Sequence, residues 1–302
     1  MILIGYGANK IGWIPIEASK YLSKLVINIA APCVVIVSFA GKEKDPENLK
    51  TLGLLCIISI GGFIISWLIS TFFVKITKVP KQDVGVYKNF LVFSNSGFMG
   101  FPVSYALFGA EGLFYMVIFN SVPQLFLYTF GVATIKRSAG LYEKEKFKIS
   151  KLLRNFITPP LIAVVVGLII YFLQLPIHSE LLEFLSTLGG IMTPLCMIII
   201  GLQLTESKIK EFVGNWRLYL MSAFRLVIIP IVFAMIIIPF GLDKLIESVT
   251  ILNFLLPCAA VPVTFAEEFG GNAKLAAEGT FLSTLLSIIT IPVAMLLLTM
   301  LY

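Results

Sequence analysis

The chain has 302 residues, of which 58% are hydrophobic and only 13% are charged, and its mean hydropathy is +0.95. So few polar side chains cannot cover the surface of a soluble fold of this length, and the composition therefore excludes a soluble protein. The formal net charge of +6 does not indicate a nucleic-acid partner, because the basic residues gather in the short connections between apolar segments.

Apolar segments recur along almost the whole chain. Crossing the hydrocarbon core takes about 20 apolar residues, and a chain in lipid must satisfy its backbone hydrogen bonds internally. We therefore expect an all-α polytopic membrane protein with about ten transmembrane helices. A short N-terminal helix precedes the predicted spans 20–40, 50–74, 86–109, 112–135, 156–174, 180–204, 216–240, 245–268 and 276–301.

Lys and Arg are distributed unevenly between the two sides on which alternate connections would lie. Most of them fall on the side of the connection at 136–151. Since an excess of Lys and Arg marks cytoplasmic connections, we predict that this connector is cytoplasmic, that both termini are external and that the protein lies in the cell membrane. The opposite side holds only Lys42, Lys44, Lys50 and Lys244.

Residue types that support catalysis or metal binding are scarce. His178 is the only histidine, and it lies in a short predicted loop. The cysteines form no CxxC pair and are interpreted as small apolar packing residues. We therefore predict no metal site, no cofactor and no catalytic residues.

Two pairs of segments indicate an internal repeat. FPVSYALFG at 101–109 returns as VPVTFAEEFG at 261–270, and the segment 14–33 resembles 175–196 at nearly the same separation. A constant separation predicts a duplicated five-helix unit, and an odd number of spans inverts the second copy in the membrane. Aligning the copies leaves the first helix short, so we expect its start to lie upstream of residue 1, with an unusually short first span as the alternative. The predicted domains are the N-terminal repeat 1–135, the connector 136–151 and the C-terminal repeat 152–302.

Both copies interrupt a predicted helix at corresponding positions. The first interruption reads SNSGFMGFP at 94–102 and the second reads LPCAAVP at 256–262. Ser and Asn favour helix N-caps, Gly weakens a helix and Pro removes a backbone donor. Discontinuous helices in matching repeat positions are typical of secondary transporters. The predicted helix-break residues are Ser94, Gly100, Pro102, Pro257 and Pro262.

A broken helix predicts an anion site. Its second half begins with unpaired N–H groups and a partial charge of about +0.5, so a carboxylate is a natural ligand there. Asn120 and Gln124 are four residues apart and share one helix face. Helix–helix hydrogen bonding, worth under about 1 kcal/mol each, is the alternative role for these two. The predicted substrate-binding residues are Asn95, Ser96, Gly97, Asn120, Gln124, Pro257, Cys258 and Thr264.

Three ionisable residues near the predicted spans call for an interpretation. Arg225 lies inside the span 216–240, and we expect it to reach the cytoplasmic face, with pairing to an anionic substrate as the alternative. Glu267 and Glu268 end the second broken helix. We expect them to be solvated, with a role in proton coupling as the alternative.

The segments SNSGFMGFPVSYALFGAEG, FNSVPQLFLYTFG and LPCAAVPVTFAEEFGGNAKLAAEG resemble the auxin efflux carrier family of membrane transport proteins, and the similarity runs through essentially the whole chain. The resemblance implies two inverted five-helix repeats, a scaffold and a transport bundle, crossing fourth and ninth helices, and elevator-type movement. It also implies an asparagine on the anionic substrate at the first crossover, the position of Asn95.

This chain departs from the plant carriers at two points. They have a proline before that asparagine, where this chain has Ser94, and many have a long hydrophilic loop where this chain has the short connector. The architecture therefore carries over better than auxin as the substrate. Compact members of the family are associated with malate, malonate and similar anions.

We therefore expect a transporter rather than an enzyme. It would export or exchange a small organic anion, a malate-like or auxin-like mono- or dicarboxylate, across the lipid bilayer. A sodium- or proton-coupled carrier of related fold is the alternative, although it would need an acidic residue at the crossover. An intramembrane enzyme or a receptor is a remoter alternative, and a homodimer is left open.

Overall fold

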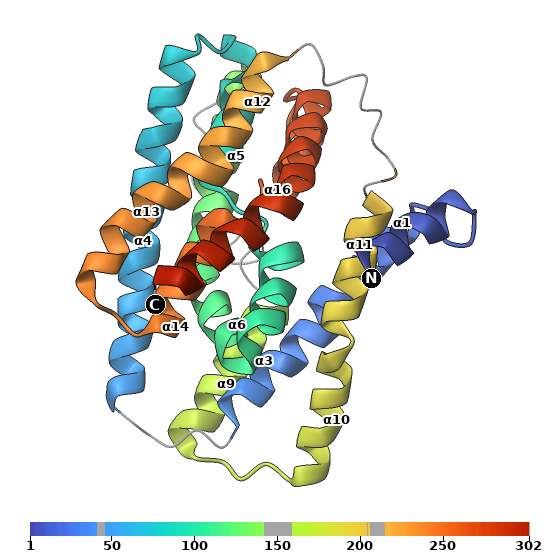
Figure 1. Cartoon of the computed structure of the whole chain (residues 1–302), viewed down its shortest axis with the longest axis vertical. Helices are drawn as coiled ribbons and strands as arrows, with labels where there is room; N and C mark the ends of the chain where they lie inside the picture. The colour runs from blue at the N-terminus through green and yellow to red at the C-terminus, as the bar shows by residue number, and fades with distance from the viewer. Residues whose placement is uncertain (41–45, 142–158, 204, 206–214, 302) are drawn as a thin grey trace. The chain divides into compact units, whose positions relative to one another are not determined.

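The computed structural model describes residues 1–40, 46–141, 159–203, 205 and 215–301. Throughout these ranges the regular structure is helical, and extended backbone pairs only in one isolated bridge, between Ser94 and Cys258. The helices form two compact units, each assembled from separate stretches of the chain (Figure 1). The first unit comprises Met1–Cys56, Gly97–Ser121 and Ile157–Ser207, and the second comprises Ile57–Ser96, Val122–Phe156 and Lys208–Tyr302.

The first unit packs short apolar helices closely together. Its α3 lies against α9 and α10, and its α1 lies against α11. Glycines permit these approaches: a β-carbon on Gly5 would lie 2.3 Å from the carbonyl oxygen of Ile198, and one on Gly167 would meet the ring of Phe39. The helices of this unit are α1 (Ile2–Lys10), α2 (Ala18–Leu25), α3 (Ala31–Phe39), α9 (Pro159–Leu173), α10 (Ser179–Gly190) and α11 (Met192–Gln203).

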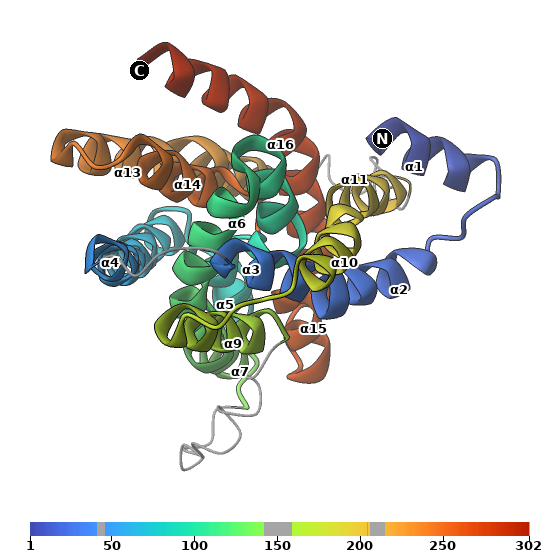
Figure 2. The ribbon, with the colours of Figure 1, turned by 90° about the horizontal axis from the view of Figure 1, so that it is seen from below.

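The second unit contains the long apolar helix α16 and a set of shorter helices. The path from α12 to α13 runs through a π-helical turn at Phe224–Ile228, and α14 returns beside α13 (Figures 1 and 2). Phe233 and Phe254 stack across this pair, with ring centroids 3.6 Å apart. The helices are α5 (Val84–Val92), α7 (Val132–Ser138), α12 (Trp216–Ala223), α13 (Ile229–Ile237), α14 (Lys244–Leu255), α15 (Val261–Glu268) and α16 (Ala273–Leu301).

Two helices continue from one unit into the other. These are α4 (Pro46–Ile76) and α6 (Phe101–Phe126). Inside α6 the backbone leaves the helical region at Gly109, where φ is 68° and ψ is −161°. Residues with side chains rarely adopt a positive φ, so glycine is required at this bend.

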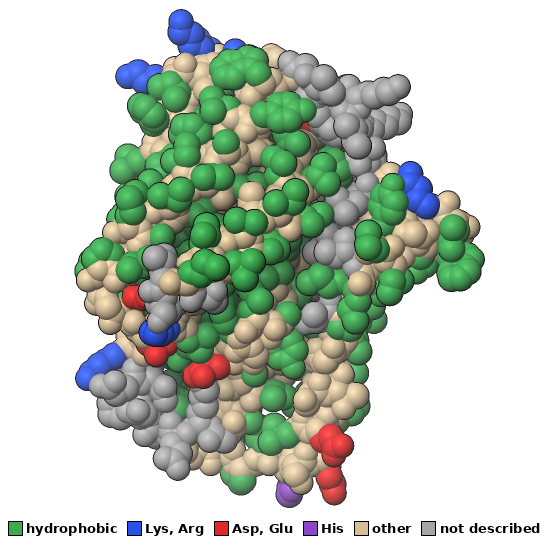
Figure 3. Space-filling model, in the orientation of Figure 1, with side chains coloured by type: hydrophobic (Ala, Val, Ile, Leu, Met, Phe, Trp, Pro, Cys, Tyr) green, Lys and Arg blue, Asp and Glu red, His purple; other side chains and the backbone are tan. Residues whose placement is uncertain are grey.

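Within the described residues, four helical stretches are long and apolar enough to cross a membrane. Figure 3 shows hydrophobic side chains over the face on which α13 and α16 lie. Ile231 and Met235 of α13, and Val293 and Leu297 of α16, are each at least half exposed. A surface of this kind needs lipid rather than water around it. The four stretches are Lys50–Ile76, Ser96–Ser138, Trp216–Phe240 and Ala273–Leu298.

Four predicted spans, 50–74, 112–135, 216–240 and 276–301, fall on the four long apolar stretches. The span 86–109 is interrupted after Val92, and 180–204 is divided at Ile191 between α10 and α11. The total of ten membrane helices stays a prediction. The connector 136–151 lies largely outside the described residues. Each compact unit takes stretches from both predicted repeats, and the inverted repeat itself stays a prediction.

The contact between α5 and α7 yields a stability prediction. The Gly85 N–H donates to Ser138 Oγ at 2.7 Å, and a β-carbon on Gly85 would lie 2.5 Å from the carbonyl oxygen of Thr134. We expect Gly85→Ala to lower the free energy of unfolding by about 1–3 kcal/mol, because backbone atoms must move apart. Gly61→Ala is the control, since no heavy atom outside the adjoining backbone of its own helix lies within 4 Å of its β-carbon position. Equal thermal unfolding of the two variants would contradict the close packing.

Candidate functional site

Two helices of the second unit are interrupted, and the sequence explains where. The first, α5, ends at Val92, and Phe93 is extended with φ −106° and ψ 124°. The second, α14, ends at Leu255, and Leu256 is extended with φ −66° and ψ 148°. A residue before proline avoids the helical region, so Pro257 favours the extended Leu256. In the first interruption, Ser and Asn side chains offer the backbone alternatives to a helix.

The two interruptions pair with each other. The Asn95 N–H donates to the Pro257 carbonyl at 2.9 Å, and the Ala259 N–H donates to the Phe93 carbonyl at 2.9 Å. Together they form the antiparallel bridge between residues 94 and 258. A break inside a membrane exposes backbone groups that cost several kcal/mol if left unpaired, and this exchange satisfies four of them. We call the paired segments 93–96 and 256–259 the crossover.

A buried asparagine joins the two broken helices through its side chain. Asn253, in the last turn of α14, is 2% exposed. Its Oδ1 accepts hydrogen bonds from Ser96 Oγ at 2.7 Å and from Ser94 Oγ at 3.3 Å. The C-terminal end of α14 is thereby tied to the start of the π-helical turn at Ser96–Gly100, which leads into α6.

Arg225 lies at the crossover rather than at the membrane surface. Its side chain is fully buried, at 0% exposure, so the expectation that it reaches the cytoplasmic face is wrong. The guanidinium donates to three main-chain carbonyls: Nε to Leu256 at 3.0 Å, one terminal nitrogen to Leu91 at 3.2 Å and the other to Asn253 at 3.4 Å.

These carbonyls explain the position of Arg225. They belong to the C-terminal ends of α5 and α14, where carbonyl groups lack intrahelical partners and the helix carries about half a negative charge. A guanidinium offers five N–H donors in a planar fork and one positive charge, so it suits several carbonyls at once. Arg225 therefore neutralises the negative ends of both interrupted helices.

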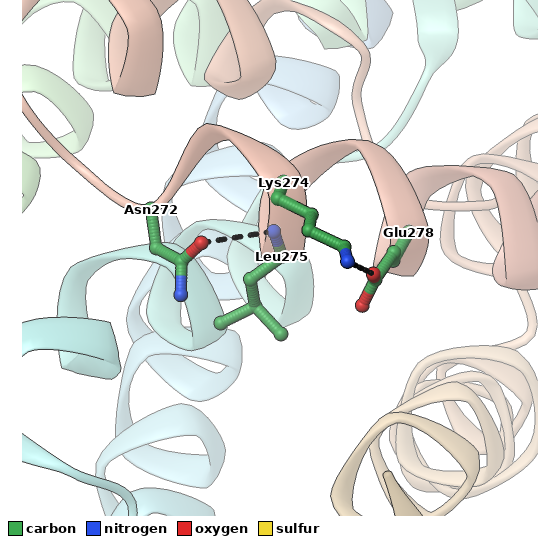
Figure 4. Close-up of polar contacts among 4 residues, drawn as sticks. All are labelled: Asn272, Lys274, Leu275 and Glu278. Atoms are coloured by element: carbon green, nitrogen blue, oxygen red, sulfur yellow. Dashed lines mark hydrogen bonds and ion pairs between the residues drawn. The ribbon is translucent and has the colours of Figure 1, made fainter. Parts of the chain in front are cut away.

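The last helix, α16, supports the second half of the crossover. The Cys258 N–H donates to Ser283 Oγ at 3.2 Å, and Thr280 Oγ1 donates to the Ala259 carbonyl at 3.4 Å. The N-terminus of α16 is held by Asn272, whose Oδ1 accepts from the Leu275 N–H at 3.1 Å (Figure 4). Asn272 Nδ2 also donates to Asp83 Oδ1 at 2.9 Å, which ties α16 to the segment before α5.

One ion pair, shown in Figure 4, lies in the first turns of α16. Lys274 Nζ lies 3.8 Å from Glu278 Oε1. The lysine is 74% exposed, so the pair contributes little. The N-cap at Asn272, worth about 1 kcal/mol, is the stronger constraint on where α16 begins.

The predicted binding residues occupy different environments. Asn95 is 8% exposed, and its side-chain amide makes no hydrogen bond to another described residue. A β-carbon on Gly97 would meet no atom within 4 Å. Pro257 and Cys258 lie within the crossover, whereas Thr264 is on the exposed face of α15.

The remaining predicted residues are placed as follows. Asn120 belongs to the first unit and Gln124 to the second, and both are half-buried. Gly100 ends the π-helical turn before α6, and Pro102 and Pro262 are the second residues of α6 and α15. Proline is tolerated in a first helical turn, so both prolines lie where the second half-helices begin. Glu267 and Glu268 are exposed at the end of α15.

We did not predict from the sequence that Arg225 and Asn253 bind the residues around the crossover. The available signal was polarity: Asn253 stands in the apolar run TILNFLLP, one turn before Pro257, and Arg225 stands in the apolar run SAFRLVII. An ionisable or polar side chain within a membrane span marks a functional or structural site by default.

Comparison with known proteins identifies the family. A family model described as membrane transport protein matches residues 1–295. An uncharacterized transporter of Methanothermobacter thermautotrophicus is 28% identical over 294 residues, covering 97% of this chain and 93% of the relative. An uncharacterized transporter of Methanocaldococcus jannaschii is 26% identical over 305 residues, covering 96% and 93%. The chain therefore belongs to the membrane transport protein family, the auxin efflux carriers that its sequence resembles, and is a transporter rather than an enzyme.

Proposed function

We propose that this transporter carries a small organic anion, a mono- or dicarboxylate, and that the carboxylate binds at the crossover. The observation that carries the proposal is that one polar side chain at the crossover is bound to the protein and another is not. Arg225 donates to main-chain carbonyls at the C-terminal ends of α5 and α14, whereas the side-chain amide of Asn95, a residue 8% exposed, makes no hydrogen bond to another described residue. A buried polar group without a partner favours a ligand that supplies one.

The helix geometry supports the same ligand. The second half-helices begin directly after the crossover, at Ser96 and at Val261. Their first N–H groups point away from the helix and carry partial positive charge, which favours an anion. Asn95 and the backbone at Gly97 are the primary contacts in this proposal. The hydroxyl of Ser96 is already bound to Asn253, and it orients the segment rather than the substrate.

The other predicted residues take secondary roles in this proposal. Pro257 and Cys258 shape the opposite side of the crossover, and Gln124 and Thr264 belong to other helices of the second unit. The carrier is further proposed to have ten helices in two inverted repeats, 1–135 and 152–302, with a cytoplasmic connector at 136–151 and external termini in the cell membrane. Elevator-type movement completes the proposal, and the support for it is the family resemblance.

The alternative of a sodium-coupled carrier finds less support at the crossover. Transporters of this kind coordinate their ions through carbonyls of unwound backbone and of half-helix C-termini. Here the carbonyls of Leu91, Asn253 and Leu256 already accept hydrogen bonds from Arg225. A cation at the same carbonyls would lie against a fixed positive charge, which is unfavourable in a low dielectric.

Thermal unfolding of the purified protein with candidate ligands tests the proposal. We expect malate, malonate or an aromatic carboxylic acid to raise the midpoint, because a ligand at one hundred times its Kd adds about 2.7 kcal/mol to stability. The uncharged amides of the same acids are the matched controls and should not stabilise. If no carboxylate stabilises the protein at any pH tested, the anion proposal is wrong.

A further inference from the structure

An open apolar groove lies in the second unit, and its lining includes none of the crossover residues. Its volume is about 590 Å³, which lies in the range of small-molecule sites. Apart from one threonine its lining side chains are apolar, and the Thr129 hydroxyl already donates to the Leu125 carbonyl of its own helix at 2.8 Å. The lining residues are Ile60, Val122, Leu125, Phe126, Thr129, Phe130 and Ala133.

Irregular helix geometry accounts for the groove. Pro123 lies inside α6, and a π-helical turn follows at Leu127–Gly131 before α7 begins. Proline and π-turns both interrupt the regular hydrogen-bond ladder and bend a helix. Phe63 of α4 stacks on Phe126 at 4.0 Å, and Phe130 stays 47% exposed beside it. This surface cannot hold the small anion proposed above, because it offers no free hydrogen-bond donor.

The groove leads to two basic side chains. Phe130 packs edge-on against Trp67 at 5.9 Å, and Lys88 Nζ lies 4.6 Å from the centroid of the Trp67 ring. Arg137 follows Ala133 by four residues on α7, so both share one helix face. The charges of Lys88 and Arg137 interact electrostatically, and neither has a carboxylate within ion-pair distance among the residues that the structure describes.

We propose that the α4–α7 groove binds an anionic phospholipid, with an acyl chain along the apolar lining and the headgroup phosphate between Lys88 and Arg137. An acyl chain suits a surface without hydrogen-bonding groups, because burying its methylene groups is favourable. A phosphate suits two like charges that lack a counterion among the residues placed in the structure. Both features lie on one side of one unit, and a phospholipid is the ligand that combines them.

Native mass spectrometry of the detergent-purified full chain tests this proposal, with phosphatidylglycerol and phosphatidylcholine as probes. We expect the wild type to retain phosphatidylglycerol preferentially. The double variant Lys88→Gln/Arg137→Gln should lose about thirtyfold in affinity for phosphatidylglycerol, whereas its affinity for phosphatidylcholine should be unchanged. The matched control Lys81→Gln/Lys274→Gln removes the same charge from two exposed lysines of the same unit and should retain the preference.

Two further measurements distinguish a bound phospholipid from free phosphate and from a second copy of the chain. Ala133→Phe fills the groove and should weaken retention of both lipids, whereas inorganic phosphate should not compete with either. Competition by inorganic phosphate, or undiminished lipid retention by Ala133→Phe, would show that no acyl chain binds here. A change of oligomeric state in Ala133→Phe without a change in lipid retention would assign the groove to a second copy of the chain. An unaltered preference in the double variant overturns the headgroup site.

Discussion

Replacing Arg225 by Met is expected to destabilise the second unit by about 3 kcal/mol and to abolish transport. The substitution keeps most of the side-chain volume but leaves the carbonyls of Leu91, Asn253 and Leu256 without their donor. A buried acceptor that loses its partner costs about 1–3 kcal/mol. Relief of the desolvation of a buried charge works in the opposite direction, and three unpaired carbonyls in a water-poor site outweigh it.

Arg217→Met is the matched control for this prediction. Arg217 lies in α12, which leads into the π-helical turn that contains Arg225. It is only half-buried and donates through Nε to a single carbonyl, that of Thr77, at 3.0 Å. Water can replace that bond, so we expect a loss below about 1 kcal/mol. Arg225→Lys, which keeps the charge but has fewer donors, should fall between the two.

Thermal unfolding and amide hydrogen exchange measure these effects. Exchange at Asn95 and Ala259 should accelerate in Arg225→Met, because their N–H groups are paired across the crossover. If Arg225→Met is as stable as Arg217→Met and both amides remain protected, then Arg225 does not hold the crossover together.

The crossover shows what sequence reasoning can reach in this protein. The positions of the breaks follow from local chemistry, because Pro257 constrains the residue before it and Ser94 begins a run of residues that cap helices. The partners of Arg225 do not follow from local chemistry. They are main-chain carbonyls on two helices, and a main-chain carbonyl has no signature in a sequence. Proximity to a membrane surface was therefore the default expectation, and it was wrong.

Which face of a short helix is buried is equally hard to predict from the sequence. Thr264 lies one residue after Val263 on a short helix whose buried positions are Pro262, Phe265 and Ala266. Its exposure depends on which side of α15 packs inward, and eight residues between a break and a turn are too few to establish a periodicity. The composition of the two compact units was unpredictable for a related reason, because packing between helices far apart in the chain decides it.

Asn95→Ala is expected to weaken binding of the carboxylate by tenfold to one hundredfold while leaving the unliganded protein as stable as the wild type. A hydrogen bond to a charged group contributes about 1.5–3 kcal/mol, which sets that range. Stability should be unchanged because the Asn95 side chain makes no hydrogen bond to another described residue. Its backbone pairing with Pro257 does not depend on the side chain.

Ser96→Ala gives the opposite pattern and so makes the Asn95 prediction specific. It removes the 2.7 Å hydrogen bond to the buried Oδ1 of Asn253, so we expect a loss of about 1 kcal/mol in stability and a smaller change in affinity. Ligand-dependent thermal shifts on the two variants report both quantities at once. If Asn95→Ala lowers stability and leaves affinity intact, its amide holds the fold rather than the substrate, and the site lies elsewhere. If Asn95→Ala weakens carboxylate binding and leaves stability unchanged, the amide binds the carboxylate directly. A structural role would have lowered both the affinity and the stability.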